Sequence, residues 1–175
     1  HMITIGYELY CKLVEDTIKE LSGGEVRPGD EMETSIELPV EAHIPGDYIP
    51  DELVKLQMYK KIASVRDEAD RSEIIDELLD RFGEIPKETL NLIQIALIKA
   101  MASRNGIWRV RQEQRKLVFD FRHAKSLDPQ KIANAAAKYG NSLFVHGGPR
   151  PFIRINLQSN DKLSEAIQFL TTLNQ

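Results

Sequence analysis

A short stretch of this chain, DELLDRFGEIP, is rich in carboxylates and runs from Asp76 to Pro86. Residues 67–84 hold eight acidic side chains and two arginines, so their net charge is −6. Carboxylates at this density can serve as a general acid and base, as ligands for a metal ion, as a solvated helix face, or as a docking edge for a basic partner. The direction in which the side chains point decides among these four roles.

The spacing of the apolar residues predicts that this stretch belongs to a helix over residues 67–82. Asp67 can cap its start, and Gly83 ends it. At about 100° per residue, one side of the helix collects the carboxylates Glu73, Asp76, Glu77 and Asp80. The other side collects the apolar residues Ile74, Ile75, Leu78, Leu79 and Phe82. Because the two stripes are opposed, the carboxylates are expected to face solvent, with Ile75, Leu78 and Phe82 buried.

Because the carboxylates face outward, the most favoured interpretation is a solvated helix face, and the next is a docking edge for a basic partner. A solvated face usually mixes charges of both signs to gain ion pairs between successive turns, whereas this helix is strongly acidic, which leaves docking open. A metal site would need supporting Asn or His ligands or a Gly-rich loop, and a catalytic pair of carboxylates would need a cleft and a raised pKa. An outward helix stripe provides none of these.

The rest of the sequence lacks the common patterns of catalysis and cofactor binding. It contains no GxxxxGK[ST] phosphate loop, no GxGxxG dinucleotide turn and no GxSxG nucleophile turn. Its four histidines are not paired at metal-ligand spacing. The sequence therefore predicts no catalytic residue, no metal site and no cofactor in this chain, which is expected not to be an enzyme.

Composition indicates a globular chain of 175 residues without a membrane span or a signal peptide. Its single cysteine, Cys11, allows no internal disulfide and favours a reducing, cytoplasmic compartment. Cys11 itself is interpreted as a helix-packing residue. His1 and Met2 are interpreted as a cloning scar, which leaves residues 3–175 as a single domain.

The pattern along the chain predicts an α+β fold, with a helical N-terminal portion over about 3–105 and a sheet-containing portion over about 106–175. Residues 34–42 alternate like a half-buried strand, and Pro39 places that strand at a sheet edge or against a partner because proline lacks an amide donor. After residue 106 the order ββα-ββα predicts a small, mostly antiparallel sheet with two helices. The helical portion is expected to contain helices near residues 6–22, 51–64, 67–82 and 86–105.

The two halves of the chain carry opposite charge. Residues 1–88 hold 22 acidic and 10 basic side chains, a net of −12, and residues 89–175 hold 5 and 13, a net of +8. On the predicted strand 107–112, Arg109 and Arg111 share a face, whereas Trp108 lies on the other and is expected to pack in the core. A basic sheet face with a tryptophan can bind single-stranded nucleic acid by charge and stacking. A nucleic-acid-binding module in the basic C-terminal half is therefore the alternative function.

Three stretches match one family in order and spacing: IGYELYCKLVEDTIKEL (Ile5–Leu21), ELPVEAHIPGDYIPDELVKLQMYKKIAS (Glu37–Ser64) and IIDELLDRFGEIPKETLNLI (Ile74–Ile93). Together they resemble the C-terminal domain of the bacterial transcription-repair coupling factors, the Mfd family. The combination of IPxxYIPD with DRFGxIP is the specific part. The likeness spans roughly residues 3–101, and the remainder agrees only in length and pattern.

The resemblance implies a longer parent protein with known tasks. That parent would be an ATP-dependent double-stranded DNA translocase, which removes stalled RNA polymerase and recruits UvrA in transcription-coupled nucleotide excision repair. ATP and magnesium would belong to its motor domains, outside this domain. The domain itself would be regulatory and autoinhibitory, because it would dock on the N-terminal UvrB-like module and mask the surface that binds UvrA.

The same resemblance places the family's contact acids on Glu77 and Asp80. These carboxylates are expected to meet arginines of the UvrB-like module, since a guanidinium group suits a carboxylate. Geometry alone extends the docking role to Glu73 and Asp76. On this interpretation the acidic helix is a docking edge.

Overall fold

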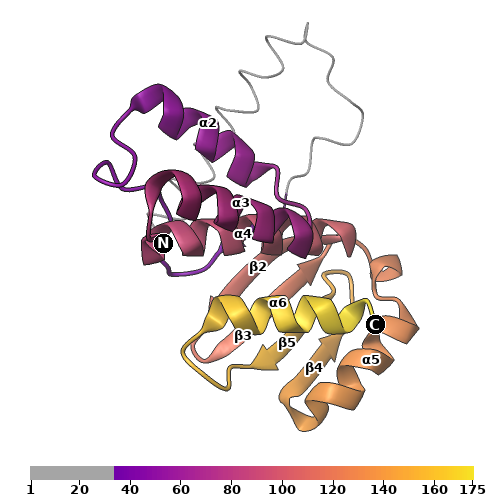
Figure 1. The fold of residues 1–175 in the computed structure, drawn as a ribbon. Coiled ribbons are helices and arrows are strands. Elements are labelled where there is room, and N and C mark those ends of the chain that lie inside the picture. The colour runs from indigo at the N-terminus through magenta and orange to yellow at the C-terminus, as the bar shows by residue number, and fades with distance from the viewer. Residues whose placement is uncertain (1–33) are drawn as a thin grey trace, which may run out of the picture. The chain divides into compact units, whose positions relative to one another are not determined.

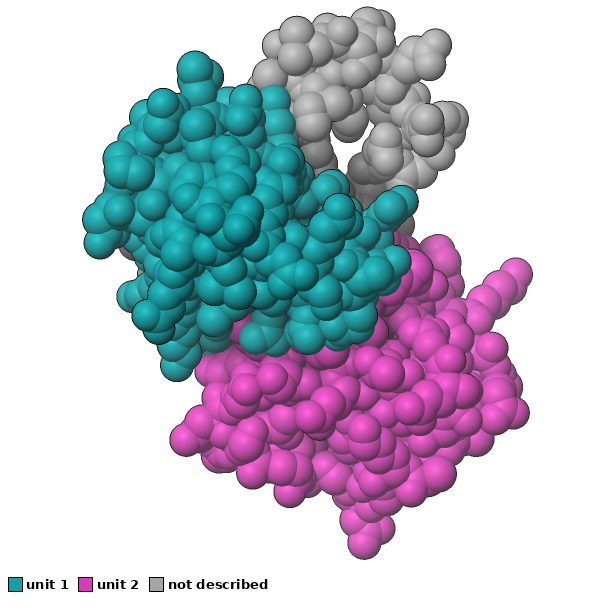
Figure 2. Space-filling model, in the orientation of Figure 1, with its two compact units in different colours: residues 1–33, 39–97 teal, residues 34–38, 98–175 magenta. Residues whose placement is uncertain are grey.

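The structure is a computed structural model that describes residues 34–175, and its fold is α+β, as predicted (Figure 1). The expected helix near residues 6–22, Cys11 and the two leading residues lie outside the described part of the chain. The described residues divide into two compact units, which Figure 2 shows in different colours. Unit 1 comprises residues 39–97, and unit 2 comprises residues 34–38 and 98–175.

Unit 1 contains helices α2 (Glu52–Ala63) and α3 (Glu68–Phe82) and the first part of α4 (Lys87–Arg104). Their ends follow from local chemistry. Asp51 caps α2 by accepting hydrogen bonds from the amides of the second and third helical residues, and Asp67 caps α3 by accepting one from the amide of Asp70. Gly83 ends α3 with a φ of 83°, a conformation that glycine adopts without steric cost. The predicted start and stop signals of α3 are confirmed.

The two motifs of the specific signature contact each other inside unit 1. The hydroxyl of Tyr48, from IPGDYIPD, lies 3.2 Å from the carbonyl oxygen of Leu78 and 3.0 Å from that of Gly83. The rings of Tyr48 and Phe82 lie 5.9 Å apart. Burial raises the pKa of the Tyr48 hydroxyl above its ordinary value, so it stays a neutral donor. Tyr48 therefore joins the IPGDYIPD motif to the C-terminal end of α3 by hydrogen bonds and a ring contact.

Helix α3 packs through a narrower stripe than its apolar pattern predicts. Leu78 is 0% exposed and Ile74 is 5% exposed, whereas Leu79 is 48% exposed. The expected burial is confirmed for Leu78 and is wrong for Ile75 and Phe82, which are half-buried. Residues four apart lie above one another on a helix, so a helix that contacts its core along one line buries only such a row.

Unit 2 contains a five-stranded sheet of order β1-β2-β3-β5-β4. Helix α5 (Pro129–Tyr139) follows β3 and α6 (Lys162–Leu173) follows β5, so the predicted ββα-ββα order is confirmed. All neighbouring strands are antiparallel except β1 and β2, which are parallel. The strands are β1 (Ser35–Glu37), β2 (Ile107–Glu113), β3 (Lys116–Phe121), β4 (Leu143–His146) and β5 (Phe152–Asn156).

The first strand lies at the edge of the sheet, as Pro39 predicts, but it is shorter than the predicted 34–42. Ser35 and Glu37 align with Arg109 and Arg111 of β2. The strand ends two residues before Pro39, which cannot donate to a ladder hydrogen bond. β1 therefore brings one short acidic segment beside the arginines of β2.

The two faces of the sheet differ in character. On one face β3 and β5 present apolar side chains, and the ring of Phe119 stacks at 4.3 Å on that of Phe169 from α6. Helix α6 lies across this face in Figure 1. Strand register places Arg109, Arg111 and Asp120 on the opposite side, which we call the polar face.

The predicted alternation along β2 is wrong at Trp108. The register shifts between Ile107 and Arg109, so these two residues lie on opposite faces although their numbers share a parity. Such an irregularity adds one unpaired residue to a strand. Trp108 is 37% exposed rather than packed in the core, and the guanidinium carbon of Arg109 lies 4.5 Å from the centre of its ring system.

Candidate functional site

Three of the four predicted docking carboxylates face solvent on α3. Glu73, Asp76 and Asp80 are exposed, and we call these three residues the acidic face. No hydrogen bond or ion pair joins their carboxylates to residues 34–175. Leu79 borders the acidic face, at about 60° from Asp76 around the helix. The acidic face thus combines three open carboxylates with one exposed apolar side chain.

Glu77, the fourth predicted carboxylate, is engaged inside unit 1. Its two carboxylate oxygens lie 2.9 Å from the Nζ of Lys61 on α2. One of the same oxygens accepts a hydrogen bond of 2.9 Å from Arg81, one turn further along α3. The Glu77 side chain is 29% exposed, so the expectation of a fully outward Glu77 is wrong. Glu77 bridges α2 and α3, a contact that the pattern of α3 alone does not contain.

The bridge changes the titration of Glu77. Hydrogen bonds from Lys61, and then from Arg81, hold the pKa of the Glu77 carboxyl below its ordinary value. The unfolded chain therefore binds more protons than the folded chain when the pH falls toward that ordinary value. The stability that Glu77 contributes is present above the ordinary pKa and is lost as the pH falls through the lowered pKa.

Glu77→Gln should lower the free energy of unfolding at neutral pH by about 0.2–1 kcal/mol, the range of partly exposed ion pairs. The difference from the wild type should shrink as the pH is lowered below about 4.3, the ordinary value for glutamate. Urea denaturation at several pH values measures both effects. Glu73→Gln is the matched control on the acidic face and should show neither effect. A difference that does not change with pH would contradict the bridge.

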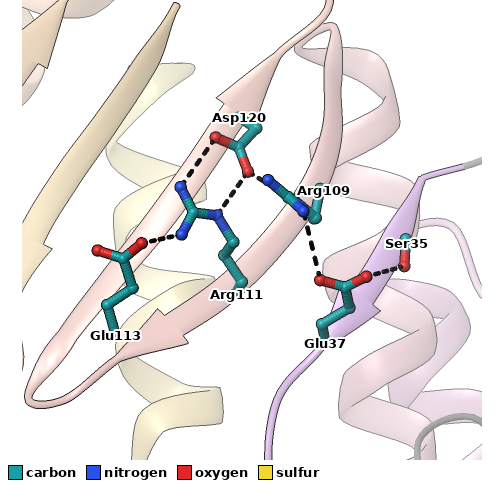
Figure 3. Close-up of polar contacts among 6 residues, drawn as sticks. All are labelled: Ser35, Glu37, Arg109, Arg111, Glu113 and Asp120. Carbon is teal, nitrogen blue, oxygen red and sulfur yellow. Dashed lines mark hydrogen bonds and ion pairs between the residues drawn. The ribbon is translucent and has the colours of Figure 1, made fainter. Parts of the chain in front are cut away.

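A second cluster of charges lies on the polar face of the unit 2 sheet (Figure 3). Asp120 is its centre, with a side chain only 10% exposed. One of its oxygens accepts hydrogen bonds from the Nε of Arg109 at 2.7 Å and from the Nε of Arg111 at 2.8 Å. Arg111 also binds Glu113, and Arg109 lies 3.9 Å from Glu37 of β1. The hydrogen bond with Asp120 is the main reason that the pKa of Arg111 is raised.

This cluster corrects the basic face expected on β2. Two arginines meet three carboxylates there, so Arg109 and Arg111 do not present a free positive surface. The sequence contained one local signal for this outcome. In the apolar run of β3, KLVFDF, Asp120 is a lone acid, and a nearly buried carboxylate requires cationic or hydrogen-bonding partners. The partners themselves come from other strands, and Glu37 lies more than 70 positions earlier in the chain.

Residues 34–175 contain neither a candidate membrane-spanning helix nor a cluster of metal-ligand side chains. No helix there has the length and apolar character that a membrane span requires. No three His, Cys, Asp or Glu side chains of this part gather as they would around a metal ion.

Comparison with known sequences gives one family. The sequence model described as the TRCF domain matches residues 38–132, more than half of the chain. A transcription-repair-coupling factor of Bacillus subtilis is 27% identical over 164 residues, which cover 93% of this chain and 14% of the relative. A transcription-repair-coupling factor of Escherichia coli is 29% identical over 178 residues, which cover 99% of this chain and 16% of the relative. The chain therefore spans about one sixth of the length of these relatives.

Comparison with solved structures agrees with the sequence comparison. A solved structure described as the crystal structure of the C-terminal domain of transcription-repair coupling factor superposes with a TM-score of 0.70. The match covers 82% of this chain and 94% of the other, at 23% sequence identity. At that identity the likeness establishes a shared fold.

Proposed function

This chain belongs to the TRCF domain family of transcription-repair coupling factors, and on that premise we propose that it is the regulatory, non-catalytic domain of such a protein. Its parent is an ATP-dependent DNA translocase that acts in the cytoplasm on stalled RNA polymerase and recruits UvrA. ATP and magnesium bind the parent's motor domains, and this domain contributes no catalytic residue. It docks on the UvrB-like module of the same protein and masks the surface that UvrA would use.

The acidic face of α3 supports this docking role. Asp76, Asp80 and Glu73 are exposed and make no hydrogen bond or ion pair with residues 34–175, so each can accept one from an incoming cation. Like charges held together on one helix repel each other, and a basic partner relieves that repulsion. Arginine is the fitting partner, because its planar guanidinium group binds carboxylates with two parallel hydrogen bonds. Leu79 adds an apolar contact at the border.

Glu77 and Asp80 then have different roles. Asp80 is a direct contact residue for the UvrB-like module. Glu77 already binds Lys61 and Arg81, so an incoming arginine must share its carboxylate with them or displace one of them. Glu77 also holds α3 against α2 and thereby fixes the direction of the acidic face.

The expected strength of the interface between the acidic face and the UvrB-like module suits a contact that must open. Exposed ion pairs contribute roughly 0.2–1 kcal/mol each, so the acidic face alone gives a weak interface. Covalent linkage in one protein raises the effective concentration to the order of millimolar. The domain therefore stays docked in the intact protein and is released when another part of the protein moves.

A titration of this chain against the isolated UvrB-like module tests the proposal. We expect saturable binding that weakens as salt rises, because exposed charges are screened beyond about 10 Å at 0.1 M ionic strength. Calorimetry or fluorescence anisotropy at low and high salt measures this. Absence of binding at low salt, with both proteins folded, would reject a docking role for this domain.

A further inference from the structure

Aromatic side chains and an arginine gather on the polar face at the β4–β5 edge of the unit 2 sheet. Cross-strand register pairs Phe144 with Arg154 and His146 with Phe152, so all four side chains lie on one face. The His146 and Phe152 rings stack at 5.1 Å, and those of Phe144 and Phe152 lie 5.9 Å apart. The guanidinium carbon of Arg154 lies 4.6 Å from the Phe144 ring centre. We call these four residues the aromatic platform.

The aromatic platform is accessible. Phe144 is 46% exposed, His146 is also exposed, and Phe152 and Arg154 are half-buried. The apolar core of unit 2 lies on the other side of the sheet, where Phe119 meets Phe169. The exposed ring of Phe144 does not pack in that core, and a cluster of accessible rings is more informative than one exposed apolar side chain.

The turn that follows β4 passes close to the ring of His146. A Cβ atom placed on Gly148 would lie 2.7 Å from the Nε2 of His146, closer than real Cβ contacts allow. The absence of a side chain at Gly148 leaves room for the ring in this position. The His146 ring stacks on Phe152, and a ring that is already so placed loses less entropy on binding.

The charge of unit 2 indicates the kind of ligand. Its described residues hold 13 basic and 6 acidic side chains, a net of +7. The acids are engaged inside the unit. Asp128 and Asp161 cap α5 and α6, Glu165 accepts hydrogen bonds from the amides of residues 158 and 159, and the other three belong to the Asp120 cluster. Unit 2 therefore carries an excess of positive charge, which attracts a polyanion.

We propose that the aromatic platform binds single-stranded nucleic acid. Unpaired bases stack on aromatic rings and on guanidinium planes, while basic side chains neutralise the phosphates. The platform offers Phe144 and His146 for stacking and Arg154 for contact with a phosphate, within a positively charged unit. A duplex keeps its bases stacked inside, so it cannot use these rings in the same way. This function goes beyond docking and depends on residues of the other unit.

The test measures binding of the purified chain to a labelled oligothymidylate of about ten nucleotides by fluorescence anisotropy, at about 50 mM salt. We expect saturable binding that Phe144→Ala weakens by about tenfold, within the range measured for loss of one stacked base. Phe144→Tyr keeps an aromatic ring and should keep the affinity. Leu53→Ala is the matched control, because Leu53 is an exposed leucine of unit 1, 73% accessible, and it should change nothing.

Two further measurements separate the contribution of base stacking from that of charge, and binding of DNA from binding of RNA. Arg154→Gln should reduce the slope of log affinity against log salt by about 0.7, the value for one phosphate contact with a single strand. An oligouridylate of equal length shows whether RNA replaces DNA on the same residues. Circular dichroism confirms that each variant is folded, and Arg154→Gln still tests the proposal if Phe144→Ala does not fold. Absence of saturable binding, or equal affinities for wild type, Phe144→Ala and Arg154→Gln, would overturn it, as would tighter binding of a duplex.

Discussion

Leu78→Ala should lower the free energy of unfolding by about 2–5 kcal/mol, the range for truncating a buried leucine. The reason is its position at the centre of the α3 contact with the core of unit 1, where it is 0% exposed. Alanine removes three carbon atoms and leaves a cavity that the packed neighbours fill only in part. Urea denaturation followed by circular dichroism gives the change in free energy.

The neighbouring residue provides the control for that measurement. Leu79 has the same side chain on the same helix, but it is 48% exposed, so Leu79→Ala should change the free energy of unfolding by about 0.5 kcal/mol or less. If Leu78→Ala and Leu79→Ala changed the free energy of unfolding by similar amounts, α3 would not pack through the row of Ile74 and Leu78. The outward direction of the acidic face would then lose its support.

Asp76→Lys combined with Asp80→Lys should weaken binding of this chain to the UvrB-like module on the order of 100-fold. The reason is that like charges facing each other across an interface cost several kcal/mol. Neutral replacements should act less, by about fivefold at most for each residue, because they remove only an exposed ion pair. The titration proposed for the wild-type chain measures all of these variants.

Two controls keep this prediction specific. Glu41→Lys reverses one exposed charge of unit 1 that does not belong to α3, so it changes net charge without altering the acidic face and should leave binding unchanged. The double variant should keep its stability within about 0.5 kcal/mol, as surface substitutions usually do. Weakening by Glu41→Lys as strong as that by Asp80→Lys alone, which changes the net charge equally, would show that the UvrB-like module responds to net charge alone and would contradict docking through the acidic face.

The sequence predicts those parts of the fold that local chemistry decides. Asp51 and Asp67 cap helices because their short carboxylates reach amides two or three residues ahead, and Gly83 stops α3 because it tolerates a positive φ. Pro39 placed β1 at a sheet edge for a similarly local reason, the missing amide hydrogen. Such features need only a few neighbouring residues.

The candidate sites depend on contacts that no local pattern contains. Glu77 lies on the predicted outward stripe, but Lys61, 16 residues earlier, reaches its carboxylate from α2. Arg109 seemed part of a basic strand face, but its partner Asp120 comes from the next strand of the sheet. The irregularity at Trp108 then reverses the parity on which the face assignment depended. In each case the tertiary arrangement, which pairs distant segments, decides which charges stay free.

The aromatic platform was missed for the same reason. Phe144 and His146 lie on β4, and Phe152 and Arg154 lie on β5, with a turn of glycine and proline between them. Each strand alone is a short run rich in apolar residues, and nothing local indicates which of its faces is exposed. Their common face becomes visible only when the register pairs the two strands.

The affinity of UvrA for the full-length parent protein tests the central claim most directly. The measurement compares the wild type with the variant that carries Asp76→Lys and Asp80→Lys, both confirmed to be folded. If the acidic face holds this domain on the UvrB-like module, the variant opens and binds UvrA more tightly than the wild type. Equal UvrA affinities would contradict the claim and leave Glu73, Asp76 and Asp80 as the solvated face of a helix.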